Sequence, residues 1–148
     1  MEDEMETIFS SFLFTLFAIK ALQPIADKVG LLDMPNYRKH HQGAVPLIGG
    51  VAIFIGVVIT SLIFMKLNYQ HKILLGSSSV IVLLGVFDDL KDISVRLRLF
   101  VQASCTVFMC LSLNVTLSHF GHMFWFDEVN IGALGYLVAI IAVIGGIN

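Results

Sequence analysis

The stretch LIGGVAIFIGVVITSLIFMKL, residues Leu47–Leu67, decides the class of fold. It holds one charged residue, Lys66, which comes next to its end. A helix needs about 20 mostly apolar residues to cross the hydrocarbon of a bilayer. This run is long enough and apolar enough, so it predicts a transmembrane helix.

Four further apolar runs lie on either side of it. They are Thr7–Leu22, Ile73–Phe87, Leu99–Leu117 and Ile131–Ile147. The second and the last of these four are short, but short helices are tolerated where neighbouring helices cover them. The 148 residues are 57% hydrophobic and 14% charged, whereas soluble domains carry about 25% charged residues. The sequence therefore predicts an all-α, polytopic membrane helical bundle, part of one integral membrane domain, rather than an unusually apolar soluble domain.

The basic residues predict the orientation of these helices. Two loops, residues 24–46 and 88–98, lie on the same side of the predicted bundle. Seven of the nine Lys and Arg residues fall on that side, and Lys66 and Lys72 fall on the other. Because cytoplasmic loops carry an excess of Lys and Arg, both loops are expected in the cytoplasm and the N-terminus outside it. The aromatic run Phe124–Phe126 then suits the opposite interface.

Several classes of protein and site are disfavoured. The formal net charge of −2 argues against nucleic-acid binding. The acidic start MEDEME lacks the basic region of a signal peptide, so the first run is expected to be retained. Cys105 and Cys110 lie in one apolar run and do not share a helix face, so we interpret them as small apolar residues. The histidines show no spacing typical of zinc ligands.

The first cytoplasmic loop is rich in cations and turn residues. Its basic run is Arg38, Lys39, His40 and His41, and the run PLIGG, Pro46–Gly50, follows. Arg and Lys side chains at the headgroup level are suited to hold a phosphate. The alternative, which composition alone favours, is a positive-inside anchor that touches anionic lipid.

The second cytoplasmic stretch, LLGVFDDLKDISVRLR, puts three carboxylates directly after an apolar run. They are Asp88, Asp89 and Asp92. If the stretch is helical, Asp88 and Asp92 share a face and Asp89 lies about 100° around the axis. Adjacent carboxylates repel each other unless a cation lies between them, and Mg²⁺ is commonly held by one or two carboxylates with substrate phosphates. The alternative is a solvated helix end. An acidic metal site beside basic residues such as Lys91 suggests a reaction on a phosphorylated lipid.

Two segments carry a resemblance to a known family. DMPNYRKHHQGAVPLIGG, Asp33–Gly50, followed by GVFDDLKDISVRLRLFVQ, Gly85–Gln102, resembles the polyprenyl-phosphate N-acetylhexosamine-1-phosphate transferases. The likeness is greatest to the bacterial branch that uses UDP-N-acetylglucosamine and undecaprenyl phosphate, in the first membrane step of O-antigen or enterobacterial common antigen synthesis. The resemblance implies a polytopic enzyme of the bacterial inner membrane, with its active site on the cytoplasmic face and UMP as a product.

The resemblance also implies roles for particular residues. Asp88 and Asp89 match the family's essential aspartate pair, which acts in catalysis and holds Mg²⁺ or Mn²⁺. Other residues match segments near the substrates: Arg38, Lys39, His40, Pro46, Gly49, Gly50 and Lys91. Asn148 stands about where the family's next motif, an Asn-rich nucleotide and metal loop, begins. We therefore expect an N-terminal portion of such an enzyme, inactive by itself.

Two alternatives stay open on the sequence. The pattern Asp88-Asp89-x-x-Asp92 also suits a membrane prenyltransferase, although a second acidic motif is missing from the sequence. The second alternative is that the protein is a non-catalytic membrane remnant. The sequence leaves open whether the protein forms a homodimer.

Overall fold

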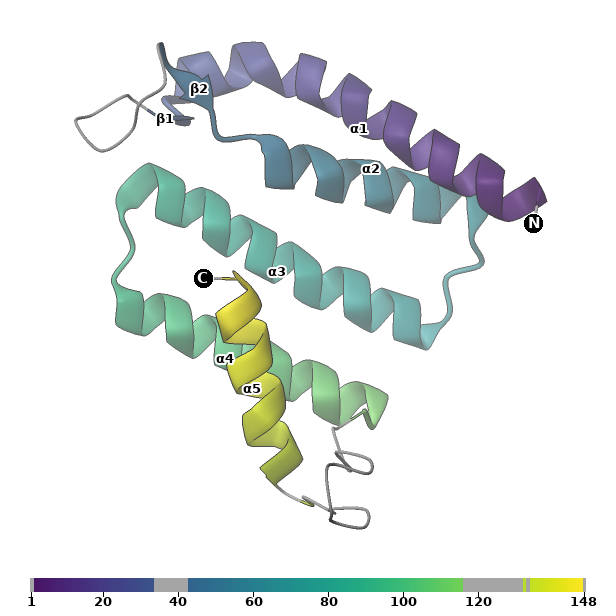
Figure 1. Cartoon of the computed structure of the whole chain (residues 1–148), viewed down its shortest axis with the longest axis vertical. Helices are drawn as coiled ribbons and strands as arrows, with labels where there is room; N and C mark the ends of the chain where they lie inside the picture. Colours follow the sequence, from purple (N-terminus) through teal and green to yellow (C-terminus); the bar gives the residue numbers. More distant parts are fainter. Residues whose placement is uncertain (1, 34–42, 116–131, 133, 148) are drawn as a thin grey trace, which may run out of the picture. The chain divides into compact units, whose positions relative to one another are not determined.

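The computed structural model describes all residues except 1, 34–42, 116–131, 133 and 148. In chain order its elements are α1 (Glu2–Val29), β1 (Leu32–Asp33), β2 (Val45–Pro46), α2 (Gly49–Phe64), α3 (Tyr69–Lys91), α4 (Val95–Leu113) and α5 (Leu134–Ile147). Each of the five predicted apolar runs overlaps one helix (Figure 1). The predicted all-α membrane bundle is thus confirmed, with one short β-ribbon added to it.

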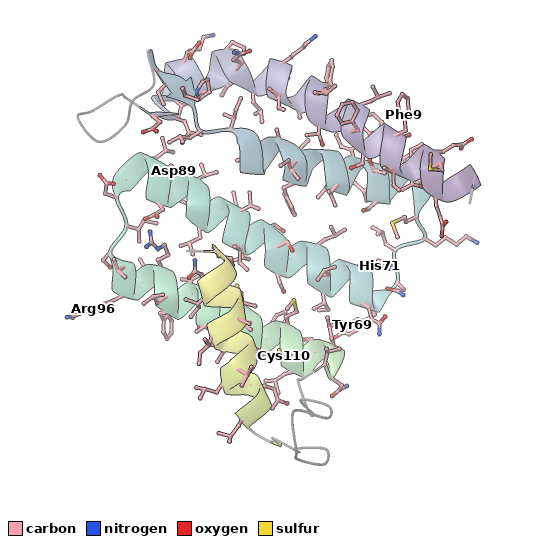
Figure 2. All side chains as sticks on the ribbon, viewed as in Figure 1. Phe9, Tyr69, His71, Asp89, Arg96 and Cys110 are labelled. Atoms are coloured by element: carbon pink, nitrogen blue, oxygen red, sulfur yellow. The ribbon has the colours of Figure 1, made fainter. Side chains whose placement is uncertain are left out.

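Three of the five described helices have the length and composition of membrane spans. These three, α1 from Glu4 onward, α3 and α4, are long and apolar enough to cross a bilayer, and α2 and α5 are shorter apolar helices. Large apolar side chains such as Phe9 and Phe17 of α1 are mostly exposed, and Figure 2 shows Phe9 pointing away from its helix. Such side chains suit contact with lipid rather than water.

The chain divides into two compact units. The first comprises residues 1–68 with 82–92, and the second comprises residues 69–81 with 93–148. The helix α3 therefore contributes its last turns to the first unit and its first turns to the second. The first unit contains the acidic pair and the β-ribbon.

In the first unit, α1 and α2 pack through small residues. The buried side of α2 comprises Ala52, Gly56, Thr60 and Ser61. A Cβ atom built on Gly56 would overlap Oγ1 of Thr15 and would lie 3.0 Å from the backbone nitrogen of Thr15. Membrane helices approach closely where such small residues face one another. Gly56 therefore sets how near the two helices can come.

The first helix is longer than the sequence predicts. The loop expected from residue 24 begins instead at Gly30, because α1 continues through Pro24 to Val29. Proline removes one helical hydrogen bond, which favours an end but does not force one. The helix ends at Gly30, whose φ of 79° is a left-handed conformation that favours glycine. The N–H groups of Gly30 and Leu31 both donate to the carbonyl of Ala26 at 3.0 Å.

The β-ribbon follows directly. Its strands β1 and β2 are antiparallel, with Leu32 opposite Pro46 and Asp33 opposite Val45. The N–H of Leu47 donates to the carbonyl of Leu31 at 3.0 Å and extends the pairing. Below the ribbon lies a small buried core of Ala26, Leu31 and Ile48, with Ile19, Leu22, Leu47 and Val86 packed against it. The core joins the end of α1, the start of α2 and the last turns of α3.

In the second unit, α4 packs against α5. The buried side of α4 carries Gln102, Thr106 and Cys110, one helical turn apart from each other, and α5 buries Gly135. The hydroxyl of Thr106 donates to the carbonyl of Gln102 at 2.8 Å, so this polar group is satisfied within its own helix. Ser94 caps the start of α4 by accepting from the N–H of Leu97 at 3.4 Å.

The turn between α3 and α4 is tighter than predicted. The predicted loop 88–98 shrinks to residues 92–94, because α3 runs to Lys91 and α4 starts at Val95. Asp92 has a φ of 47° and its N–H donates to the carbonyl of Asp88 at 2.9 Å. Asp92 therefore ends the helix and does not extend the face that Asp88 occupies, which corrects the arrangement considered from the sequence.

Asp92 is accordingly expected to tolerate substitutions that allow a left-handed backbone. Asp92→Val should lower the free energy of unfolding in detergent by about 1–2 kcal/mol, because a β-branched side chain is strained at this φ. Asp92→Asn and Asp92→Gly should stay close to the parent, because both residues adopt this conformation readily. A detergent-unfolding series that follows helicity by circular dichroism would measure all three. Equal stability of the valine and glycine variants would contradict the assignment.

Candidate functional site

The acidic pair lies in the last turn of α3. The uncharged run Ile73–Phe87 ends directly before Asp88, so we expect the pair just beyond the membrane-spanning part of the helix, near the lipid headgroups. Asp88 is half-buried and Asp89 is exposed. Figure 2 shows Asp89 at the end of α3. The C-terminal end of a helix carries partial negative charge and favours cations. Two carboxylates at this end add further negative charge, so a cation would be stabilised here.

The pKa of the Asp89 carboxyl reflects this concentration of negative charge. Partial burial raises the pKa of the Asp89 carboxyl above its ordinary value, and the negative charges of Asp88 and then Asp33 raise this pKa further. All three effects disfavour the ionised form, and a bound cation would oppose them by favouring the ionised form. Lys91, in the same last turn, is one nearby positive charge.

Asp33 is a part of the site that the sequence analysis missed. It belongs to β1, and its charge reaches Asp89. The pairing of β1 with β2, and the packing of the flanking residues Leu31 and Leu47 with Ala26 and Val86, bring this residue to the end of α3. The only signal in the sequence is its position as the first residue of the run DMPNYRK.

Removing the neighbouring charges should lower the pKa of Asp89. Asp33→Asn removes one like charge, so the ionised form of Asp89 should persist to lower pH. Asp88→Asn should lower the same pKa further, because Asp88 has the larger effect of the two. Carboxyl-¹³C NMR titration of the chain in micelles, with Asp89→Asn to assign the signal, measures both shifts. An unchanged Asp89 pKa in Asp33→Asn would show that the two carboxyls are farther apart than described.

A cavity of 160 Å³ joins the acidic residue to the start of α2. Asp89 and Gly85 of α3 line one side, and Gly50 and Val51 of α2 line the other. A Cβ atom at Gly50 or Gly85 would meet nothing within 4 Å, so both glycines leave room at the cavity wall. Of the predicted site residues, Asp89 and Gly50 are thereby brought together.

The start of α2 adds a second kind of group. Its N-cap residue, Ile48, offers no side-chain cap, and the first turn contains no acidic residue. The first N–H groups of a helix have no helical partner and carry partial positive charge, which favours a bound phosphate. Gly49 and Gly50, both exposed, form this first turn. The cavity therefore has a carboxylate on one wall and, on the other, the start of a helix, where N–H groups favour anions.

The other predicted site residues are placed as follows. Pro46 lies in β2 and Lys91 is exposed in the last turn of α3. Arg38, Lys39, His40 and Asn148 lie outside the described residues. Arg38, Lys39 and His40 belong to the segment that connects β1 with β2. Because β1 pairs with β2, this segment starts and ends beside Asp33 and Val45.

The donor set is suited to a divalent cation shared with a substrate. Within the described part of the chain, no three His, Cys, Asp or Glu side chains gather as a complete metal site. Asp88 and Asp89 offer carboxylate oxygens, and Mg²⁺ is commonly bound by one or two carboxylates together with phosphate oxygens and water. The pair thus suits a cation that arrives with a phosphorylated substrate, rather than a closed structural metal.

The chain belongs to the glycosyl transferase family 4. Residues 71–148, more than half of the chain, match this family, and they include Asp88 and Asp89. The chain is also similar to undecaprenyl-phosphate alpha-N-acetylglucosaminyl 1-phosphate transferases. The protein from Yersinia pestis is 39% identical over 137 residues, 93% of this chain and 38% of the relative. The protein from Escherichia coli O157:H7 is 37% identical over 141 residues, which are 95% of this chain and 38% of the relative.

A third such relative, from Salmonella typhi, is 36% identical over 147 residues and matches 97% of this chain. The chain spans 38–39% of the length of these relatives. No solved structure matches the chain significantly. The similarity to relatives covers the ribbon and the start of α2 as well, because it extends over nearly the whole chain.

Proposed function

We propose that this chain is part of a membrane enzyme that transfers N-acetylglucosamine 1-phosphate from UDP-N-acetylglucosamine to undecaprenyl phosphate. The names of the three relatives describe this transfer. The observation that carries the proposal is the cavity that Asp89 and Gly50 line together. It combines a carboxylate suited to a metal with helical N–H groups suited to a phosphate. Membership of the glycosyl transferase family 4 favours this function over a prenyltransferase.

The reaction needs positioning and charge stabilisation more than covalent help. An oxygen of the lipid phosphate attacks the sugar-bearing phosphorus of the nucleotide, a new P–O bond forms, and the bond to UMP breaks with its electron pair. A bound Mg²⁺ or Mn²⁺ would offset the charge that gathers on the phosphates. Asp88 and Asp89 would hold that ion, and the first N–H groups of α2 would donate to a phosphate oxygen. Lys91, and the basic run Arg38–His40, would neutralise further phosphate charge.

The proposed place of this chemistry is the cytoplasmic face of the bacterial inner membrane. There the transfer would be the first membrane step of a cell-envelope polysaccharide such as O antigen or enterobacterial common antigen. The support is the asymmetry of Lys and Arg, seven residues against two. Asp33, Asp89 and the β-ribbon all belong to the first unit.

Single-cysteine labelling in intact cells is expected to show this orientation. With Cys105 and Cys110 changed to serine, a cysteine in place of Met5 or Trp125 should react with a membrane-impermeant maleimide. A cysteine in place of Arg38 or Asp89 should react only after the cells are opened. The reason is that the basic residues Lys28, Arg38 and Lys39 keep their loop in the cytoplasm. Labelling at position 38 in intact cells would contradict the orientation.

The function is tested with a chimeric enzyme. Residues 1–148 replace the matched segment of the Escherichia coli O157:H7 relative, and the purified chimera is given UDP-N-acetylglucosamine, undecaprenyl phosphate and Mg²⁺. Release of UMP that requires the lipid phosphate is the expected result. Residues 1–148 alone serve as a control and are expected to release none. A chimera that is inserted and folded but releases no UMP would contradict the proposal.

A further inference from the structure

The chain passes between its two compact units at three places. Two of them, between residues 68 and 69 and between residues 92 and 93, lie at the ends of α3, where residues 65–68 and 92–94 are not helical. The third lies between residues 81 and 82, inside α3, which Figure 1 shows as one continuous helix. Short non-helical segments absorb changes of φ and ψ readily, whereas a helix is held by a hydrogen bond at every residue. Whether the units can move relative to each other therefore depends on α3.

The residues just before this third place weaken the helix. Residues 76–79 read GSSS within the apolar part of α3. Glycine and serine both favour helix less than alanine does, and sharp bends in helices occur at pairs of these two residues. A Cβ atom at Gly76 would meet nothing within 4 Å, so close packing does not account for the glycine. Its backbone freedom is the better explanation.

Ser79 supports a bend at the same position. Its hydroxyl donates to the carbonyl of Leu75 at 2.7 Å and to the carbonyl of Gly76 at 3.0 Å. A serine that bonds back to the preceding turn often bends its helix. A bend in a membrane helix frees main-chain carbonyls, and nearby serine side chains can satisfy them. Ser79 thus already donates to the two carbonyls that a bend at this turn would free.

Ser77 adds a reason to leave the continuous conformation. Its side chain is 5% exposed, and its hydroxyl has no hydrogen-bond partner among the described residues. A buried polar group without a partner is costly. In a bent helix, a freed carbonyl of the preceding turn would accept a hydrogen bond from this hydroxyl. The Ser77 hydroxyl therefore disfavours the continuous helix relative to a bent one.

We propose that α3 is a hinge that bends at residues 76–79 and lets the two units change their relative orientation. The packing of α1 on α2 and of α4 on α5 lies within single units and would be kept in both conformers. Asp88 and Asp89 belong to the first unit, beyond the hinge, so bending would move them relative to α4 and α5. The hinge would thus change the surroundings of the acidic pair without unfolding either unit. This inference goes beyond the proposed function and does not depend on it.

The test is a distance measurement by double electron–electron resonance on the whole 148-residue chain in nanodiscs of phosphatidylethanolamine and phosphatidylglycerol. Cys105 and Cys110 are changed to alanine, and nitroxide labels are attached to cysteines at the exposed positions Ile25 of α1 and Leu137 of α5. Because these positions belong to different units, the distance distribution should have two components. A second pair, Ile25 with the exposed Ile63 of α2, lies within the first unit and should give one component.

The hinge variant is Gly76→Ala with Ser79→Ala. It strengthens the helix and removes the hydroxyl that supports the bend, so one of the two components should fall relative to the other by about tenfold, which corresponds to about 1.4 kcal/mol. The matched control is Gly85→Ala with Ser104→Ala. Gly85 also has open space at its Cβ position, and the Ser104 hydroxyl donates to the carbonyl of Phe100 at 2.8 Å. The control should leave both components unchanged, and circular dichroism verifies that each variant is helical.

Three results would overturn the hinge. They are one narrow component for the pair that joins the units, two components that the hinge variant leaves unchanged, and an equal response to the control variant. Two components that only the hinge variant shifts, beside one unchanged component within the first unit, support it. The labelled chain carries no substrate, so each of these results is independent of UMP release by the chimera, which tests the proposed function alone.

Discussion

Asp89→Asn is expected to lower the turnover of the chimeric transferase by about 10²–10³-fold, the usual effect of removing one electrostatic element of a catalytic site. Asparagine keeps the shape of aspartate but removes the charge that would hold a divalent cation beside the phosphates. Asp89 lines the cavity that faces the start of α2, so its charge acts where the phosphates would lie. Initial rates of UMP release at saturating substrates and Mg²⁺ measure the effect. Asp88→Asn should produce a loss of similar size.

The matched control is Asp92→Asn. It removes one carboxylate from the same helix end, yet Asp92 ends α3 in a left-handed conformation that asparagine also adopts. Its effect on turnover should therefore be milder than that of either neighbour. Near-normal turnover of Asp89→Asn at saturating Mg²⁺ would show that the carboxylate has no catalytic role.

Gly56→Leu is expected to separate α1 from α2. Even the first atom of the new side chain would overlap Thr15, and the nearby carbonyl of Ser11 lies 3.1 Å from that position. Overpacking of a well-packed contact costs about 1–3 kcal/mol, and more where backbone lies in the way. Unfolding in mixed micelles of increasing dodecyl sulfate content, followed by circular dichroism, should show a lower midpoint. The chimera carrying this change should also lose activity, because the core below the ribbon joins α1 to α2.

Gly76→Leu on α3 is the control for this prediction. A Cβ atom at Gly76 would meet nothing within 4 Å, so a leucine there has room. Leucine also favours helix over glycine by several tenths of a kcal/mol, roughly 0.5–1. A Gly56→Leu protein as stable as Gly76→Leu would mean that α1 and α2 do not approach each other at Gly56.

The helices were predictable because a long apolar run is a local property of the chain. The run Leu47–Leu67 contains α2 without any knowledge of its neighbours. Helix ends were less predictable, since they depend on single residues. Pro24 suggested an end that the chain does not take, and Gly30 supplies the end through its backbone conformation.

The site was predictable in part for the same reason. Asp88 and Asp89 stand out because they are adjacent carboxylates directly after an apolar run, and their places at the end of α3 follow from the helix alone. Asp33 and Gly50 approach the pair only through the ribbon and the buried core, which are contacts between distant segments. No periodicity in a single sequence reports such contacts. The roles of Asp88, Asp89 and the basic run stay predictions.

The close approach of α1 and α2 at Gly56 also has a consequence for biogenesis. These two helices and the ribbon between them are synthesised before α3, and α1 contacts α2 directly. Segments nearer the N-terminus generally fold first during synthesis. The start of α2, with Gly49 and Gly50, would therefore be in place before the ribosome has made Asp89. Asp88 and Asp89 would be made later, on a helix that packs against α1 and α2 after these two have already associated in the membrane. A defect at Gly56 would therefore act before any acidic residue of α3 is made.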